Sequence, residues 1–439
     1  MNGLRSYFQN VGLLSRNIWM FVFAALLMGI GRQIFQVLRN QYLVDLGLPS
    51  EQMSSVQGFN SIGTLLIAVP AIAIIGRFRA RTLLVAVALA NSAGYFVQAW
   101  MGSLEIFQSA AFAAGLAMGL NVALAAPFLM RNTSLTGRVF AFSIQSAVSW
   151  PLSGFVGSWL SGLLQKGGAT WASGGVTLFG EFIPAHLFGY RFALAVAAAL
   201  VLLAIVPIAL IKEAPPESRG RSIRELLRVH NKGRLFWLGM PELIIGFGAG
   251  LTVPFFNVYF KSEWSLAPEE IALVFMIMFV VLIFTYLLAP PLVKRFGAVK
   301  VIVASQLLSL PFFVELALGN HLVLAVIAFI MRQALMNLSD PIYRQFAQEV
   351  ADDRDRNAVA VSVHFSRQLF FTVANFASGY LIAFDGGRFT IVIVTTIVLY
   401  VIAIGSELII LPRLDRVRRF QHLRSQRSAV VSDATGPVH

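Results

Sequence analysis

MGIGRQIFQVLRNQYL, residues 28–43, returns later in the chain as IGFGAGLTVPFFNVYF, residues 245–260. At this offset of 217 residues, two glycines, an asparagine and a tyrosine fall on the same residue types. The pairs are Gly29 with Gly246, Gly31 with Gly248, Asn40 with Asn257 and Tyr42 with Tyr259. The likeness continues in GRFRARTLLVA at 76–86 and KRFGAVKVIVA at 294–304. A repeat of this length indicates a chain built from two homologous halves.

The composition of the chain indicates lipid as its solvent. Hydrophobic residues make up 57% of the 439 residues and charged residues only 13%, whereas about a quarter of the residues in a typical soluble domain are charged. This chain has too little polar material to cover cores of that size in water. The composition therefore excludes most water-soluble enzymes.

Apolar stretches long enough to cross a bilayer recur along the whole chain. A transmembrane helix needs roughly 20 mostly apolar residues. We predict such helices over 17–40, 52–75, 82–101, 106–130, 138–164, 188–211, 235–260, 269–293, 299–319, 321–346, 357–384 and 389–411. Runs such as 83–90 lack the alternation of a membrane barrel. The predicted fold is an all-α membrane protein of twelve transmembrane helices, in two six-helix bundles related by a parallel pseudo-repeat.

Basic residues fall mainly on one side of this predicted membrane protein. Of the 34 Lys and Arg residues, 25 lie at the start, in alternate loops and in the tail, and only four lie in the opposite loops. Because basic residues concentrate in cytoplasmic loops, we expect both termini to be cytoplasmic, in a bacterial-type inner membrane. The net charge of +13 then reflects loops at the membrane surface rather than binding to nucleic acid.

One long polar segment, KEAPPESRGRSIRELLRVHNKGR at 212–234, divides the chain. We predict an N-terminal six-helix bundle over 1–211, a basic cytoplasmic linker over 212–234 and a C-terminal bundle over 235–412. Residues 413–439 form a basic cytoplasmic tail that begins at the lipid headgroups and is partly disordered.

Residue patterns for metal, redox or nucleotide chemistry do not occur in the sequence. The chain has no cysteine, and its six histidines are scattered, so thiolate and HExxH-like metal sites are excluded. The glycine-rich segment QKGGATWASGGVTLFGE at 165–181 does not match a P-loop. We therefore expect no enzymatic activity, no cofactor and no bound metal.

A short motif follows the second predicted helix. IIGRFRAR keeps Arg77, Phe78 and Arg81 of a G-x-x-x-D-R-x-G-R-R signature, with Gly76 in place of the acid. Together with two parallel six-helix repeats and a cytoplasmic linker, this motif resembles the major facilitator superfamily, and the resemblance covers essentially the whole chain. The resemblance implies alternating access, in which two bundles rock around a site near the bilayer midplane.

The fifth predicted helix carries part of a second motif. Proton-driven drug antiporters of this superfamily have a glycine-rich helix-5 pattern, and reading from Gly137 places Pro151 and Gly154 in register with it. Trp150 and Phe155 break the pattern. The match is a hint of export, and the alternative is that small residues let helices pack closely in any bundle.

Five arginines lie inside the predicted helices, and an intramembrane charge costs at least about 2.5–3.5 kcal/mol on insertion scales. Each should therefore face a cavity or a partner. On the first helix, the spacing i, i+4, i+7, i+8 predicts one polar face, made of Arg32, Gln36, Arg39 and Asn40. At the repeat offset of 217 residues, the residues equivalent to Arg32 and Arg39 are Ala249 and Phe256. The scaffold therefore does not require arginine at these positions. Arg32 either binds substrate or acts in gating, or it forms a structural salt bridge.

The tenth and eleventh predicted helices hold the other three arginines. Asp340 and Arg344 are spaced i, i+4 and are expected to pair as a gate or cytoplasmic lock. Arg332 lies near the middle of the tenth helix, away from any acid in its own segment. On the eleventh helix, His364 and Arg367 lie on a continuous polar face.

Carboxylates do not balance these arginines, because only Asp340 and Glu242 lie well inside the predicted spans. Arginine binds carboxylate or phosphate through its planar fork and keeps its proton, so we favour an anionic or amphipathic substrate. The alternative is that Glu242 and Asp340 neutralise two arginines and leave an apolar drug pocket. The predicted substrate-binding residues are Arg32, Gln36, Arg39, Gln145, Asn257, Arg332 and Arg367.

Coupling to an ion needs a group that titrates as the cavity changes its exposure. Glu242, Asp340 and His364 are the candidates for proton coupling, and Arg344 joins them as a gating residue. For Glu242 the alternative is a structural carboxylate near the cytoplasmic helix end. The sequence shows no sodium site.

These patterns together predict a monomeric secondary active transporter that moves a small organic solute with proton coupling or exchange. One alternative is a pump that exports drugs or lipid-like amphiphiles. Another, from a different class, is a transporter-shaped sensor or scaffold that binds a ligand without moving it.

Overall fold

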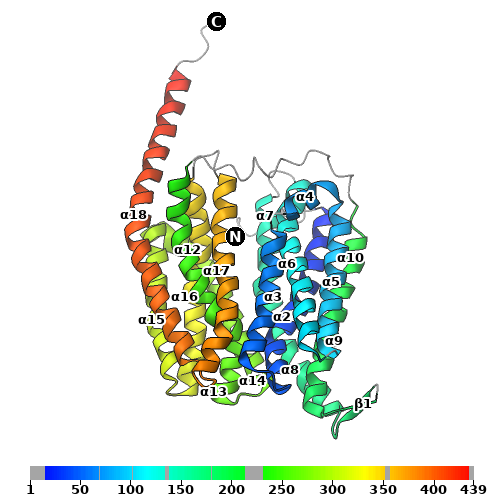
Figure 1. The fold of residues 1–439 in the computed structure, drawn as a ribbon. Coiled ribbons are helices and arrows are strands. Elements are labelled where there is room, and N and C mark those ends of the chain that lie inside the picture. The colour runs from blue at the N-terminus through cyan, green and yellow to red at the C-terminus, as the bar shows by residue number, and fades with distance from the viewer. Residues whose placement is uncertain are drawn as a thin grey trace, which may run out of the picture.

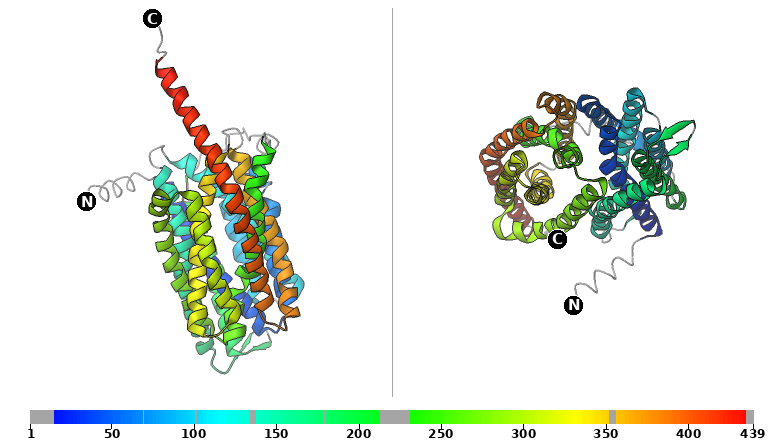
Figure 2. Two further views of the ribbon diagram at one scale, coloured as in Figure 1. Left: turned by 90° about the vertical axis from the view of Figure 1, so that its left-hand side faces the viewer. Right: turned by 90° about the horizontal axis from the view of Figure 1, so that it is seen from below.

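The computed structural model describes residues 15–68, 70–100, 102–133, 138–178, 180–212, 231–351 and 356–434. In these ranges the chain forms two helical bundles that lie side by side (Figures 1 and 2). The helices from α2 to α10 form the first bundle, and those from α12 to α18 form the second.

The first bundle contains six membrane segments, three of which are built from two helices. In chain order they are α2 (Arg16–Asp45); α3 (Ser50–Ile67) with α4 (Pro70–Arg77); α5 (Ala80–Trp100); α6 (Leu104–Asn132); α7 (Arg138–Ala147) with α8 (Ser153–Trp171); and α9 (Ala185–Leu203) with α10 (Ile205–Ala209). A π-helical turn, Val148–Leu152, joins α7 to α8. Pro151 lies in this turn, where its missing N–H prevents regular α-helical bonding.

The second bundle also contains six segments. They are α12 (Lys232–Thr252), a 3-10 turn (Val253–Phe255) and α13 (Phe256–Trp264); α14 (Pro268–Phe296); α15 (Ala298–Leu318); α16 (Leu322–Val350); α17 (Arg356–Phe384); and α18 (Thr390–Ala434). The twelve segments coincide with the twelve predicted stretches. Within the described ranges, nine helical spans are individually long and apolar enough to cross a membrane.

Two features differ from the sequence-based expectation. The glycine-rich segment 165–181, which lies between two predicted helices, is partly helical, since α8 continues to Trp171. A small antiparallel hairpin of β1 (Val176–Leu178) and β2 (Glu181–Ile183) follows α8. α18 ends at Ala434 rather than near 411 and projects beyond the bundle (Figure 2). The arginines, glutamines and leucine of RLDRVRRFQHLRSQR have good helix propensity, which favours this continuation. Most of the predicted linker, residues 213–230, lies outside the described residues.

Equivalent tyrosines make equivalent hydrogen bonds in the two halves, which confirms the repeat. The Tyr42 hydroxyl donates to the backbone carbonyl of Ala99 at 3.1 Å, and the Tyr259 hydroxyl donates to that of Leu316 at 3.0 Å. Both bonds span 57 residues. The same tertiary anchor therefore fixes the first helix of each bundle.

The repeated glycines mark close contacts between helices. A Cβ added at Gly246 would lie 2.4 Å from the carbonyl oxygen of Arg367, and one added at Gly29 would lie 2.5 Å from the Ser153 hydroxyl. Any side chain at these positions would push neighbouring helices apart. The glycines thus bring α2 against α8 and α12 against α17, which sets the position of the polar residues discussed below.

The two ends of the molecule differ in what they carry. We call the end with Lys212 and Asn231, which flank the linker, the linker side, and the end with β1 and β2 the hairpin side. The bundles meet toward the hairpin side and diverge toward the linker side (Figure 1). Contacts on the hairpin side run between α3 and α17 and between α8 and α14. They are tight, since Gly58 packs on Phe376 and Gly154 on Phe279.

The outer surface of the bundles is apolar. On α14, Leu273, Phe284 and Leu288 are 51%, 61% and 56% exposed. Long exposed apolar side chains of this kind are costly in water and favourable in a bilayer. The described surface therefore fits contact with lipid.

Candidate functional site

A cavity of about 230 Å³ lies between the bundles, and we call it the central cavity. The predicted polar face of α2 lines it, together with a residue of α13. These residues are Arg32, Gln36, Arg39, Asn40 and Asn257. The structure therefore brings together four of the seven residues predicted to bind substrate, with Asn40 of the same polar face beside them.

Arg32 contacts the distorted segment between α7 and α8. Its guanidinium donates to the backbone carbonyl of Ser149 at 3.1 Å. In the π-helical turn the Ser153 amide donates to Trp150 and Val148, so the Ser149 carbonyl lacks its usual α-helical partner at i+4. The backbone distortion thus provides a neutral acceptor for a charged donor.

Arg39 lies nearer the hairpin side of the central cavity than Arg32, and neutral groups hold it there. Its guanidinium donates to the side-chain oxygen of Asn40 at 3.1 Å and to that of Gln57. It also lies 5.4 Å from the ring centroid of Phe35, whose ring stacks on Tyr95 at 4.1 Å. An arginine over an aromatic face gains a cation–π contact, but none of these partners carries a negative charge.

The two repeated asparagines form a reciprocal link between the bundles, which we call the asparagine clasp. The Asn40 side-chain amide donates to the carbonyl of Pro254 at 2.8 Å, and the Asn257 amide donates to the carbonyl of Val37 at 2.9 Å. Pro254 is the repeat equivalent of Val37, at the same offset of 217 that separates the asparagines. The clasp is therefore pseudo-symmetric.

Further contacts close the hairpin side below the clasp. Lys261 of the second bundle pairs with Asp45 of the first at 2.7 Å and donates to the Tyr190 hydroxyl at 2.9 Å. Lys166 pairs with Glu269 at 3.2 Å. Both ion pairs join opposite bundles, so they hold the bundles together on the hairpin side of the central cavity.

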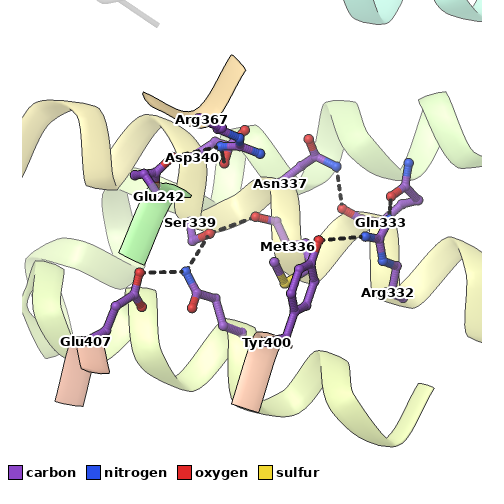
Figure 3. Close-up of polar contacts among 11 residues, drawn as sticks. Glu242, Arg332, Gln333, Met336, Asn337, Ser339, Asp340, Arg367, Tyr400 and Glu407 are labelled. Atoms are coloured by element: carbon purple, nitrogen blue, oxygen red, sulfur yellow. Dashed lines mark hydrogen bonds and ion pairs between the residues drawn. The ribbon is translucent and has the colours of Figure 1, made fainter. Parts of the chain in front are cut away.

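A second cavity, of about 260 Å³, lies mainly in the second bundle and is called the C-bundle cavity. Arg332 lines it and is only 2% exposed. Its guanidinium donates to the Tyr400 hydroxyl at 3.2 Å and to the Gln333 side chain (Figure 3). It also lies 4.4 Å from the ring centroid of Phe313 and 5.4 Å from that of Phe256. Its Nε atom has no hydrogen-bond partner.

Arg367 differs from the other intramembrane arginines because it meets two acids. Its guanidinium lies 2.8 Å from Asp340 and 3.3 Å from Glu242 (Figure 3). The sequence predicted that Asp340 would pair with Arg344, four residues along the same helix, and this pairing is not the one observed. α17 brings Arg367 against α16, and the Arg344 side chain is exposed instead.

A larger space of about 1140 Å³ opens between the bundles toward the linker side and is called the linker-side cleft. Asp340 and Arg344 line it, together with Trp150 and Tyr286, whose ring centroids lie 6.4 Å apart. Most of the other lining side chains are apolar. The cleft and the closed hairpin side together define a conformation open in one direction.

The remaining predicted residues take other positions. Gln145 lies outside the three cavities described above, and its amide donates to the Ser149 hydroxyl of the same segment at 2.6 Å. Glu242 is buried behind Arg367 rather than lining a cavity. The side chain of His364 lies outside the described residues. Among the described residues, no group of three His, Asp or Glu side chains is arranged to hold a metal ion.

Sequence reasoning missed some buried polar groups. Tyr95 and Tyr400 lie beside the arginines, and a tyrosine within a mainly apolar span was the available signal. Glu407 was not counted among the carboxylates well inside the predicted spans, but it is fully buried and accepts a bond from Gln306 at 3.4 Å. Because its partner comes from α15, the sequence of α18 alone did not indicate it.

The balance of charge is the main property of the site. Of the five arginines that the sequence places inside the membrane, Arg367 is the one with a carboxylate within 4.0 Å among the described residues, and it pairs with both Asp340 and Glu242. Arg32, Arg39 and Arg332 are bound by carbonyls, amides, a hydroxyl and aromatic faces. The cavities between the bundles are therefore cationic.

Two homologous six-helix bundles around a polar cavity that is closed on one side define a secondary transporter. Two family models match the chain: the Major Facilitator Superfamily over residues 242–432 and the MFS_1 like family over residues 7–173. The chain belongs to the major facilitator superfamily, which confirms the resemblance stated from the sequence. It is accordingly a transporter and not an enzyme. No curated protein sequence matches it.

Solved transporters share the fold over nearly the whole chain. An inward-facing, unoccupied bacterial homolog of the human lysosomal transporter Spinster has a TM-score of 0.74 at 13% identity, covering 92% of this chain and 98% of that one. A D-xylose–proton symporter gives 0.67 at 14% identity, covering 91% and 97%. The human organic anion transporter TETRAN gives 0.61 at 15% identity, covering 89% and 99%. At these identities the likeness shows the fold, and it confirms the predicted fold class.

Proposed function

We propose that this transporter carries a small organic anion by alternating access. The observation that supports the proposal is the lining of the central cavity, which holds Arg32 and Arg39 and no Asp or Glu. Arginines that lack an internal counter-ion are costly in a low-dielectric site. An anionic substrate supplies the missing charge, and the planar guanidinium favours carboxylate or phosphate groups.

We further propose that the linker side is cytoplasmic, in a bacterial-type inner membrane. The excess of basic residues in the loops that reach this side supports the assignment. On this orientation the linker-side cleft is the cytoplasmic entrance, and the conformation described here is inward-facing. The cationic lining of the cavities does not distinguish import from export.

The cluster of Glu242, Arg367 and Asp340 is the proposed proton-coupling element. Two carboxylates, from α12 and α16, share one guanidinium from α17. Protonation of either acid would weaken the ties among three helices of the second bundle. Arg344 is the proposed gating residue, because its exposed side chain lies at the linker-side cleft beside Asp340. His364 stays a candidate on the sequence alone.

The coupling proposal is tested with protein in liposomes under an imposed pH gradient. Asp340→Asn keeps the size of the side chain and removes its titration. We expect the variant to exchange substrate across the membrane at equilibrium but to lose accumulation driven by the gradient. Gradient-driven accumulation at the wild-type level would contradict the role of Asp340.

A second candidate function is export of amphiphiles, and the linker-side cleft favours it. The cleft is larger than the central cavity, and Phe142, Trp150, Leu152 and Leu287 contribute apolar surface to it. A substrate with an apolar body would be stabilised there by burial of that body. On this proposal the arginines hold the polar end of the substrate or serve only as structural partners.

Anion transport is tested by binding followed by flux. Wild type and Arg32→Gln are screened by thermal shift against carboxylates, phosphate monoesters and neutral amphiphiles, since a ligand that binds the folded state raises its stability. Arg77→Gln is the matched control, because Arg77 is exposed and lies outside the cavities. We expect anions to stabilise wild type and the control but not Arg32→Gln, and the same anions to enter liposomes that contain the protein.

Other outcomes separate the alternatives. Stabilisation by neutral or cationic amphiphiles alone, unchanged in Arg32→Gln, would refute anion transport and favour export of amphiphiles. Binding of anions without any flux across liposomes would favour the sensor or scaffold. The two measurements together therefore distinguish three classes of function.

A further inference from the structure

Unpaired arginines lie on both sides of the interface between the bundles. Arg32 and Arg39 of α2 belong to the first bundle and line the central cavity. Arg332 of α16 belongs to the second bundle and lines the C-bundle cavity. Among the described residues, none of the three has a carboxylate within 4.0 Å. The site therefore contains two separate centres of uncompensated positive charge.

The two cavities adjoin one another. Trp150, Val253, Gln333 and Phe371 line both the central cavity and the C-bundle cavity. Each cavity alone, at about 230 and 260 Å³, is smaller than the roughly 300–1,000 Å³ typical of small-molecule pockets. Taken together they reach that range. Three of the four shared residues are apolar, so the wall between the two charged centres favours an apolar segment of a ligand.

Arg332 shows that the second centre is incomplete. Its guanidinium is buried and is held by two neutral acceptors, Gln333 and Tyr400, and by the faces of Phe256 and Phe313. Its Nε–H has no acceptor. Buried polar groups are normally hydrogen-bonded, and a buried charge normally has a counter-ion. A ligand anion at this place would supply both.

We infer that the substrate carries two anionic groups joined by an apolar or aromatic body. One group binds Arg32 and Arg39, the other binds Arg332, and the body lies against Trp150 and Phe371. The groups are carboxylates or phosphates, which match the guanidinium fork equally. This inference rests on the proposed transport of anions and adds to it the number of charges and the place of each.

A substrate of this kind would also explain how binding promotes closure. A ligand shifts a conformational equilibrium only by as much as its affinities for the two states differ. An anion with one charged group reaches the arginines of one bundle only, whereas a dianion bound to Arg32 and Arg332 joins both bundles. The dianion therefore favours the conformation in which the two bundles approach each other around the cavities.

The test compares dianions with monoanions of the same length. Purified full-length protein is titrated calorimetrically with the dicarboxylates from succinate to sebacate and with their monomethyl esters. The phosphate monoesters of the matching hydroxy acids separate phosphate from carboxylate recognition. A charge-assisted hydrogen bond contributes enough for a preference of about 10- to 100-fold. We expect that preference for the dianion, with an optimum at one chain length.

Arg332→Met then assigns the second group to its arginine. In this variant we expect the affinity for the best dianion to fall to that of its monoester, while the monoester binds as it does to wild type. Arg77→Gln, in the exposed linker-side segment, should leave both affinities unchanged. The comparison of ligands on wild type needs no variant, so the inference remains testable if Arg332→Met does not fold.

The outcomes separate this inference from the proposed function. Equal affinities for dianions and monoesters at every length would refute the dianion and leave anion transport standing. No binding of any anion would overturn both. A dianion preference that persists in Arg332→Met would refute the role assigned to Arg332.

Discussion

Replacement of Asn257 by leucine should open the hairpin side of the transporter. The Asn257 amide donates to the carbonyl of Val37 across the interface at 2.9 Å, while its own oxygen accepts from the Val258 amide within α13. Leucine keeps similar volume but removes the donor. In the closed conformation the Val37 carbonyl then loses this donor and keeps the Gln41 side-chain amide, which donates to it at 2.8 Å. In the open conformation water can replace the lost donor.

The size of the effect follows from this difference. One hydrogen bond contributes about 0.5–1.5 kcal/mol net, and its loss falls on the closed state alone, while the Val37 carbonyl keeps the Gln41 amide. The equilibrium should therefore shift toward the open state by about 2- to 13-fold. Minor conformations of proteins are often populated at about 0.1–10%, so a shift of this size makes an open state near the upper end of that range measurable.

Distances between spin labels measure the shift directly. The chain has no cysteine, so Thr170→Cys in α8 and Ser262→Cys in α13 give one labelled pair on the hairpin side without background. Both positions are exposed. Gln98→Leu is the matched control, because the Gln98 amide is buried but donates within its own helix to the Gly94 carbonyl.

We expect a longer distance to gain population in Asn257→Leu and not in Gln98→Leu. An unchanged distance distribution in Asn257→Leu would refute the argument that the asparagine clasp stabilises closure. The same change in both variants would show that loss of any buried amide loosens the bundles, and would equally refute a specific role for the clasp.

Three further predictions concern closure and the charged cluster. A Cβ at Gly379 would lie 2.1 Å from the Ser54 hydroxyl in the opposite bundle, whereas one at Gly405 meets nothing within 4 Å. We therefore expect Gly379→Val to block closure and to lower the transport rate at least tenfold, and Gly405→Val to leave the rate unchanged. Arg367→Met should lower the free energy of unfolding by up to about 3–5 kcal/mol, because two carboxylates lose their partner. Chemical denaturation of the double variant Arg367→Met with Glu242→Gln should show that part of this free energy is recovered. Lys261→Met should favour the open hairpin side by about 1.5–3 kcal/mol, measured with the same spin labels, because the charged hydrogen bond between bundles is lost.

The fold was predictable from the sequence because the signal for a membrane helix lies within its own segment of the chain. Each span needs about 20 apolar residues in succession, and the backbone must satisfy its own hydrogen bonds in lipid, so length and composition decide the element. The alignment of Tyr42 with Tyr259 further predicted that the bundles are equivalent, and their hydrogen bonds to Ala99 and Leu316 agree. The hairpin and the extension of α18 escaped prediction because both lie where the apolar pattern ends.

The site was predictable only as far as it lies on one helix. The spacing of Arg32, Gln36, Arg39 and Asn40 placed them on one face of α2, and they line one cavity. The partner of Asp340 was not predictable in the same way. The i, i+4 spacing predicted Arg344 as the partner, but the packing of α17 on α16 brings Arg367 closer. Contacts between helices leave no periodic signal in a single sequence.

Comparison of the two halves separates the residues that build the gate from those that build the site. Asn40 and Asn257 are repeated, and they form a reciprocal clasp, so the symmetry of the scaffold suits a contact that both bundles must make. Arg39 is not repeated, and its equivalent, Phe256, packs its ring against Arg332 in the second bundle. A substrate is rarely symmetric about the same axis as the scaffold. The residues that break the repeat are therefore the ones to test for recognition, and those that keep it are the ones to test for closure.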